Sequence, residues 1–273
     1  MCPKVANWSG IQAQKPPPDS VGQQKDTALT PRTLRIAQID IARTIALIAM
    51  AVFHLTFDLE AFGFVERGTM ASTPWIIFAR LIAGSFIFLS GMSLVIGSLD
   101  GRPDIRKVLK RLGMIGAAAV VVSIATYFSI GYAYVRFGIL HHMFVASLLG
   151  LAVLGWNSIA LAAFGALILS FPHILPWPLF EGTGWLWLAR TTPMPPMVDY
   201  VPVLPWFGVF LFGMATAKMI HSTIGWTVVA GMCDAQARPI RILSWAGRHS
   251  LLVYLIHQPI LFSAVFAARY FIG

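Results

Sequence analysis

The chain is poor in charged residues and nearly free of cysteine. Only 11% of its 273 residues are charged, against roughly a quarter in soluble domains, and 57% are hydrophobic. This composition excludes a soluble globular domain and indicates a polytopic membrane protein. The two cysteines, Cys2 and Cys233, lie far apart in unlike segments, so they predict neither a disulfide framework nor a metal site. Because residues 1–38 lack the apolar core of a signal peptide, we expect no cleavable leader.

A soluble basic face that could bind nucleic acid is also missing, although the net charge is +9. The basic residues lie between apolar runs, which is typical of the cytoplasmic loops of membrane proteins. We therefore expect no nucleic-acid partner. The predicted surroundings are the lipid bilayer of a bacterial-type plasma membrane, which the chain crosses several times.

Two parts of different composition follow one another along the chain. Residues 1–34 are rich in proline and poor in large apolar groups, so we expect a disordered cytoplasmic tail. Residues 35–273 are the transmembrane domain, predicted to be an all-α bundle of about seven spans. The seven apolar runs are 39–58, 75–97, 109–130, 138–155, 158–176, 201–220 and 249–270. A further run at 223–232 is too short to cross and is interpreted as an interfacial segment.

The basic residues also predict the orientation of these spans. If the N-terminus is cytoplasmic, 14 of the 20 Lys and Arg residues fall in cytoplasmic segments. Only four fall in outer segments, namely Arg67, Arg136, Arg190 and Arg269. This bias predicts a cytoplasmic N-terminus and an extracytoplasmic C-terminus.

The first apolar run combines a spanning length with four ionisable residues, Asp40, Arg43, His54 and Asp58. At about 100° per residue, all four fall on one helical stripe about 120° wide. A charge facing lipid at mid-depth costs several kcal/mol, so the stripe should face protein or a polar cavity. Arg43 would lie near the inner face and His54 roughly 16 Å further along the axis.

His54 and Asp58 are the candidate catalytic pair. Asp58, four residues after His54, can accept a hydrogen bond from the imidazole and so fix its tautomer and raise its basicity. The alternative is structural: Arg43 could extend to lipid headgroups and His54 could be an interfacial histidine with satisfied hydrogen bonds. The acidic partner at Asp58 favours the catalytic interpretation.

Short motifs along the chain resemble those of transmembrane acyltransferases. An arginine is followed eleven positions later by a histidine, Arg43 and His54, with Asp40 just before them. The further pieces are His54-Leu55-x-Phe57-Asp58-Leu59, Phe86-x-Phe88-Leu89-x-Gly91, Lys110-Arg111-Leu112-Gly113, Phe137-Gly138-Ile139-Leu140-His141-His142, Asp199-Tyr200-x-Pro202-x-x-Pro205-Trp206, Gly247-Arg248-His249-Ser250-Leu251 and Tyr254-Leu255-x-His257-Gln258-Pro259. From about residue 33 to 270, the chain resembles the bacterial heparan-alpha-glucosaminide N-acetyltransferase catalytic-domain family. It departs at Thr44, where such motifs usually have glycine.

The resemblance implies transfer of an acyl group, as acetyl, from cytoplasmic acyl-CoA to an amine or hydroxyl of a carbohydrate. Basic residues at the inner mouth suit the donor's phosphates, although a role in membrane orientation alone also explains the basic loop 102–111. Arg248 is expected near the start of a helix that continues to His257, and Arg241 is an additional candidate. The candidates for donor binding are Asp40, Arg43, Arg111 and Arg248.

A second group of residues is expected on the acceptor side, near the outer face. Adjacent histidines on a helix point about 100° apart, so at most one of His141 and His142 faces a cavity. Pro259 follows His257 within the last span and can kink it beside a cavity wall. Structural roles explain each of these residues almost as well. The acceptor-side candidates are Arg136, His141, His142, Asp199, Trp206 and His257.

Two other classes use buried charges in a membrane bundle. A transporter or flippase would use the same stripe as a translocation path. An intramembrane metal-dependent hydrolase needs three converging histidines, but the spans offer only pairs at i,i+1 and i,i+8. We therefore expect no metal. For the acyltransferase, the sequence is compatible with direct transfer and with an acetyl-histidine intermediate.

Overall fold

The computed structural model describes residues 36–98, 104–175, 180–234 and 236–272. The predicted disordered tail, residues 1–34, lies outside the described residues. Within them the chain is mostly helical, as predicted. The α-helices are α1 (Ala37–Ala61), α2 (Thr73–Ile96), α3 (Ile105–Ile130), α4 (Ile139–Ala152), α5 (Ser158–Ile174), α6 (Val203–Thr223), α7 (Trp226–Gly231), α8 (Arg238–Arg248) and α9 (Ser250–Ile272). Two short parallel strands, β1 (Phe180–Glu181) and β2 (Thr191–Thr192), lie in the loop before α6.

Each of the seven predicted apolar runs corresponds to one helix, but their lengths differ. Five helices, α1, α2, α3, α6 and α9, are long and apolar enough to cross a membrane. The helices α4 and α5 have 14 and 17 residues. At 1.5 Å per residue α4 rises only about 21 Å, which is less than the roughly 30 Å of a bilayer's hydrocarbon core. Polar segments at its ends must therefore lie within the depth of the membrane if α4 crosses it.

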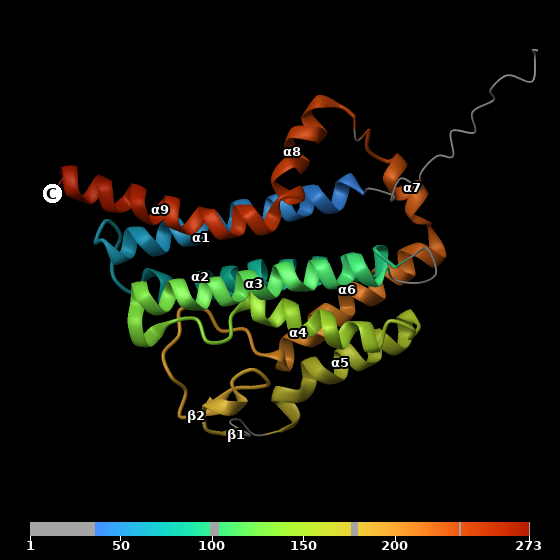
Figure 1. Cartoon of the computed structure of the whole chain (residues 1–273), viewed down its shortest axis with the longest axis horizontal. Coiled ribbons are helices and arrows are strands. Elements are labelled where there is room, and N and C mark those ends of the chain that lie inside the picture. The colour runs from blue at the N-terminus through green and yellow to red at the C-terminus, as the bar shows by residue number, and fades with distance from the viewer. Residues whose placement is uncertain (1–35, 99–103, 176–179, 235, 273) are drawn as a thin grey trace, which may run out of the picture. The chain divides into compact units, whose positions relative to one another are not determined.

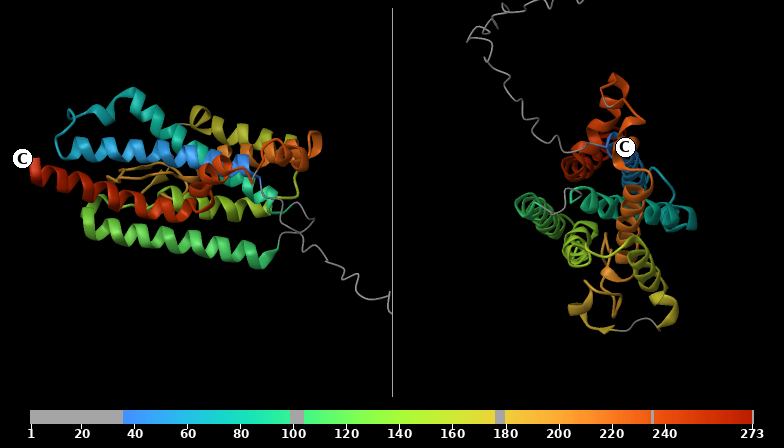
Figure 2. Two further views of the ribbon diagram at one scale, coloured as in Figure 1. Left: turned by 90° about the horizontal axis from the view of Figure 1, so that it is seen from above. Right: turned by 90° about the vertical axis from the view of Figure 1, so that its right-hand side faces the viewer.

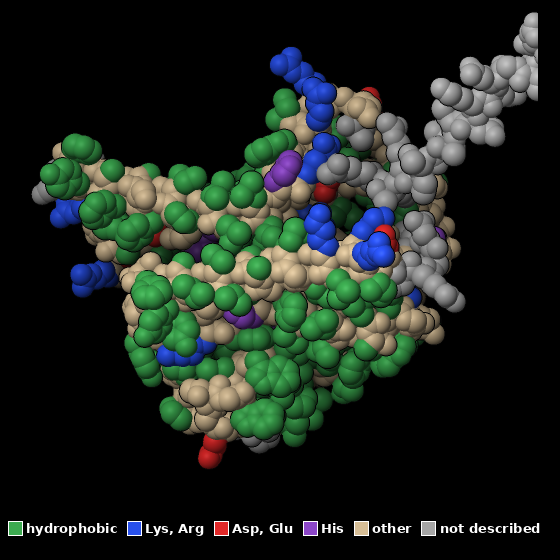
Figure 3. Space-filling view, viewed as in Figure 1, with side chains coloured by type: hydrophobic (Ala, Val, Ile, Leu, Met, Phe, Trp, Pro, Cys, Tyr) green, Lys and Arg blue, Asp and Glu red, His purple; other side chains and the backbone are tan. Residues whose placement is uncertain are grey.

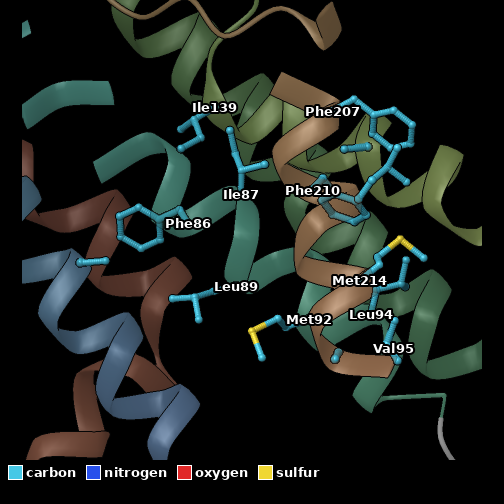
Figure 4. Close-up of a cluster of buried hydrophobic side chains, with 14 of the residues drawn as sticks. Phe86, Ile87, Leu89, Met92, Leu94, Val95, Ile139, Phe207, Phe210 and Met214 are labelled. Carbon is cyan, nitrogen blue, oxygen red and sulfur yellow. The ribbon is translucent and has the colours of Figure 1, made fainter. Parts of the chain in front are cut away.

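The helices pack side by side in Figures 1 and 2, and α2 packs closely against α6. Gly91 of α2 faces the Phe210 carbonyl, and Gly213 of α6 faces the Phe88 carbonyl. A Cβ at either glycine would overlap that carbonyl, so glycine is required for the two backbones to approach this closely. Phe210, Met214 and Ile87 fill the core beside this contact (Figure 4).

Helix α8 was not predicted. The apolar runs suggested one helix starting near Arg248, whereas Arg248 is the last residue of α8 and α9 begins at Ser250. Pro239 occupies the first turn of α8, a position that tolerates proline because its missing N–H needs no partner there. Because α8 is short and amphipathic, its apolar residues do not form a run that a search for spans detects. In Figure 1 it stands out from the other helices and crosses the direction of α1 and α9.

Candidate functional site

A cavity of about 450 Å³ opens between α1, α2, α3, α4 and the segment joining α8 to α9. Arg43, Arg111 and Arg248 line one part of its wall, and each comes from a different helix. Leu140 and Tyr254 contribute to the rest of the wall, which is largely apolar. Among the described residues that line this cavity, none is acidic. Figure 3 shows Lys and Arg side chains on one face of the molecule, over α8 and over the first turns of α3.

Asp40 holds two of the three arginines together. Its Oδ1 lies 3.2 Å from Nη1 of Arg43, one turn further along α1, and its Oδ2 lies 3.8 Å from Nε of Arg248. The Asp40 residue is buried, so this arrangement screens part of the arginine charge from the apolar surroundings. The four residues predicted for donor binding, Asp40, Arg43, Arg111 and Arg248, are therefore brought together by the fold.

Serine hydroxyls accept a further hydrogen bond from each guanidinium group. Arg43 donates to Ser93, Arg111 donates to Ser90 at 3.2 Å, and Arg248 donates to Ser244 at 2.8 Å. These serines were not among the site residues predicted from the sequence. Ser90 and Ser93 are three residues apart in the span 75–97, and hydroxyl pairs at this spacing within an apolar run were the signal that could have revealed them.

The position of Arg248 depends on a close contact between α8 and α1. The backbone N–H of Gly247 donates to Oγ1 of Thr44 at 2.8 Å, and the Thr44 hydroxyl donates to the Asp40 carbonyl at 3.1 Å. A Cβ at Gly247 would overlap the Asp40 carbonyl. Thr44, where the sequence departs from the motifs it resembles, therefore supplies the hydroxyl that joins α8 to α1.

His54 lies further along α1 and is not among the residues that line the cavity. Its ring contacts that of His257 on α9, with 5.0 Å between the ring centroids at a steep angle. The His257 ring in turn lies 5.7 Å from that of Tyr254, which is part of the cavity wall. The three aromatic side chains therefore lead from the cavity to His54.

Asp58 is not the partner of His54 that we predicted. Its Oδ1 accepts a hydrogen bond of 2.9 Å from Nε2 of Gln258, and no hydrogen bond to the imidazole is present among the described residues. Asp58 is only 1% exposed and turns toward α9, so its carboxylate lies between the two helices. The spacing of four residues between His54 and Asp58 is compatible with a contact between them, but it gives no information about Gln258, which lies 200 positions away in the sequence.

The tautomer of His257 follows from its hydrogen bond. Its Nδ1 lies 2.6 Å from the Tyr254 carbonyl oxygen, which can only accept, so Nδ1 carries the proton. In the neutral ring Nε2 is then an acceptor. Three buried acceptors near His54 have no donor among the residues that the structure describes, namely His257 Nε2, Asp58 Oδ2 and Gln258 Oε1. Buried polar atoms normally have partners, so this cluster favours a substrate with hydrogen-bond donors.

Asp199 caps helix α4. One carboxylate oxygen accepts a hydrogen bond of 2.8 Å from the N–H of Ile139, the first residue of the helix. This bond satisfies a terminal N–H, and a carboxylate is favoured at a helix N-terminus. A Cβ on Gly138 would overlap the carboxylate. Burial raises the pKa of Asp199, and the Ile139 hydrogen bond opposes that rise.

The other predicted acceptor-side residues make structural contacts away from His54. His141 accepts from the Gly138 N–H at 3.3 Å and lies 3.2 Å from the Ser123 hydroxyl. His142 is fully buried. The guanidinium of Arg136 lies over the rings of Tyr132 and Tyr134 and donates to the Pro196 carbonyl, while Trp206 packs against the core. Of the predicted acceptor-side residues, the fold brings only His257 to His54.

The comparison with models of protein families found a match. A family model described as "Heparan-alpha-glucosaminide N-acetyltransferase, catalytic" matches residues 35–259. This stretch includes the arginine cavity, His54 and His257. No curated protein and no solved structure matches the chain.

Proposed function

The chain belongs to the heparan-alpha-glucosaminide N-acetyltransferase catalytic family, and from this premise we propose a specific reaction. The protein transfers an acetyl group from cytoplasmic acyl-CoA to an amine or hydroxyl of a carbohydrate. The family match confirms the resemblance seen in the sequence motifs and makes the protein a membrane acetyltransferase. The choice of donor, the acceptor and the roles of individual residues are our proposal.

The observation that carries the proposal is the convergence of Arg43, Arg111 and Arg248 on one cavity. With Asp40 as the acidic group between them, the four side chains have a net charge of about +2. Guanidinium groups form strong, paired hydrogen bonds to phosphate oxygens. A cavity of about 450 Å³ is within the usual range for small-molecule sites. This end of the cavity would hold the donor's phosphates.

The remaining wall suits the pantetheine arm of the donor. Phe86, Leu89 and Met143 line it with apolar surface. His54 lies eleven positions after Arg43 on the same helix, which corresponds to roughly 16 Å along the axis. An extended arm anchored at Arg43 would therefore bring its thioester toward Tyr254, His257 and His54.

His54 would act as the general base. It takes a proton from the acceptor's nitrogen or oxygen while that atom attacks the thioester carbonyl; the new bond to the acetyl carbon forms and the C–S bond breaks. The proton then returns to the departing thiolate. A covalent route through an acetylated His54 remains the alternative. Asp58 has a revised role in this proposal: it holds Gln258, and with it the α9 face that carries His257.

The proposed membrane placement has seven crossings, with the start of α1 in the cytoplasm of a bacterial-type cell. The arginine cavity then lies on the side where acyl-CoA is made. Reporter fusions at residues 104 and 236 should be cytoplasmic, and one at residue 185 extracytoplasmic. An extracytoplasmic reporter at 104 would contradict both the orientation and donor access from the cytoplasm.

The test of the reaction uses purified protein, radiolabelled acetyl-CoA and a panel of amino sugars and neutral glycans. We expect label to move to at least one glycan. Arg111→Gln should raise the KM for acetyl-CoA with a smaller effect on kcat, because it removes a phosphate contact. His54→Gln should abolish kcat while coenzyme A still binds. Coenzyme A binding that is unchanged in Arg111→Gln would contradict the proposed donor site.

A further inference from the structure

Helix α8 has one face against α1 and another exposed to its surroundings. Ser244 and Gly247 are buried in the contact with α1. On the exposed side, Ile242 is 63% exposed, Leu243 49% and Trp245 58%. Three large apolar side chains exposed on one eleven-residue helix form an apolar patch that is unfavourable in contact with water. This face requires an apolar environment in at least part of its surroundings.

Basic residues share that exposed face. At about 100° per residue, Arg241, Trp245 and Arg238 fall within about 60° of one another, and Ile242 follows about 40° further round. The exposed face therefore changes from basic to apolar around the helix, and Trp245 lies in its basic part, between Arg241 and Arg238. Tryptophan is enriched at the boundary between headgroups and acyl chains, where one part of its ring is apolar and the other polar.

The direction of α8 agrees with this pattern. The long helices α1 and α9 run along one direction, and α8 crosses it beside the first turns of α1 (Figures 1 and 2). If α1 and α9 follow the membrane normal, α8 lies along the membrane plane at the end of the molecule where the arginine cavity opens. Amphipathic helices with basic and aromatic residues lie in the interface in this way.

We propose that α8 is a binding surface for anionic phospholipids. Arg238 and Arg241 contact the phosphate-bearing headgroups, Trp245 lies between them at the boundary, and Ile242 and Leu243 lie among the upper acyl chains. The occupant is anionic rather than neutral lipid because the charged side chains of this exposed face, Arg238 and Arg241, are both cationic. Each basic residue at an anionic surface contributes roughly a fivefold preference, so the two together give roughly 30-fold.

The experiment places the full chain in phosphatidylcholine nanodiscs that contain a minority of brominated lipid, which quenches nearby tryptophan. The Trp245 signal is the difference between the wild-type protein and Trp245→Phe. We expect brominated phosphatidylglycerol to quench this signal much more strongly than brominated phosphatidylcholine at the same mole fraction. The excess should shrink with added salt, because headgroup contacts are screened.

Two charge variants decide the cause. Arg238→Gln with Arg241→Gln should remove the excess quenching, whereas Arg106→Gln with Lys110→Gln removes the same charge from α3 and should leave it intact. Equal quenching by the two lipids, or an excess that survives the α8 variant, would overturn the proposal. So would a Trp245 signal that neither lipid quenches, since α8 would then face water or another protein. The readout involves no acetyl transfer, so it is independent of the proposed reaction.

Discussion

Replacing Gly247 by alanine is expected to disturb the donor cavity without touching a residue that lines it. Gly247 is buried where α8 meets α1, and a Cβ there would overlap the Asp40 carbonyl. Overpacking of this kind typically costs about 1–3 kcal/mol. The higher helix propensity of alanine returns at most about 1 kcal/mol. We therefore expect a net destabilisation of up to about 3 kcal/mol.

The functional effect follows from the way the overlap is relieved. If α8 moves away from α1, Arg248 leaves the Oδ2 of Asp40, from which its Nε is 3.8 Å distant. A hydrogen bond to a charged group is worth about 1.5–3 kcal/mol, so loss of the Arg248 contact to a donor phosphate corresponds to roughly 10- to 100-fold weaker binding. The KM for acetyl-CoA should rise by a factor in this range while kcat changes little.

The assay compares Gly247→Ala with Gly113→Ala, in thermal unfolding and in coenzyme A binding. Gly113 is also inside a helix, but a Cβ there has open space around it. Gly113→Ala should be neutral or slightly stabilising, because only helix propensity changes. If both variants bind coenzyme A as the wild type does, the contact between α8 and α1 does not position Arg248 and the reasoning is wrong.

Three further outcomes are expected. His54→Gln should abolish acetyl transfer, and Asp58→Asn should reduce it less, since the Asp58 carboxylate contacts Gln258 and not the imidazole. Kinetics with saturating donor measure both variants. Equal losses of activity would restore a direct role for Asp58. Asp199→Ala should lower unfolding stability by about 1 kcal/mol through loss of the α4 cap, whereas Asp199→Asn keeps an acceptor and should cost less. Burial raises the pKa of Asp199, so the carboxyl binds a proton more tightly in the folded state than in the unfolded state. Its contribution to folding stability therefore falls as pH rises through the raised pKa. Asp199→Asn should flatten this part of a curve of stability against pH. Elemental analysis should find no stoichiometric zinc, and activity that chelators abolish would favour a metal-dependent reaction instead.

The positions of the long helices could be predicted because each one requires an apolar run of spanning length. The convergence of Arg43, Arg111 and Arg248 was also predictable, since each lies at the same end of a span once the orientation is assumed. Helix α8 could not be found in this way. Its eleven residues alternate between buried small side chains, exposed apolar ones and arginines, so no continuous run marks it.

The partner of Asp58 shows a different limit of the sequence. A helical wheel places Asp58 and His54 on one stripe of α1, and this stripe does face α9. The wheel cannot rank a local partner against one from another helix. Gln258 takes the hydrogen bond because α9 packs along α1 at this depth, and such packing depends on the whole bundle. Thr44 is a similar case, since its role appears only when the Gly247 N–H lies beside it.

The two proposals meet in helix α8, because Arg248 at its end lines the cavity and Arg238 and Arg241 in its first turn belong to the proposed lipid surface. A lipid that holds α8 against α1 would favour the arrangement in which Arg248 lines the donor site. A ligand shifts such an equilibrium only by its difference in affinity for the two arrangements. If anionic lipid strengthens coenzyme A binding by some factor, linkage requires that coenzyme A strengthen lipid binding by the same factor. Adding coenzyme A should therefore increase the quenching of Trp245 by brominated phosphatidylglycerol, and Gly247→Ala, which loosens the contact between α8 and α1, should weaken this coupling in both directions.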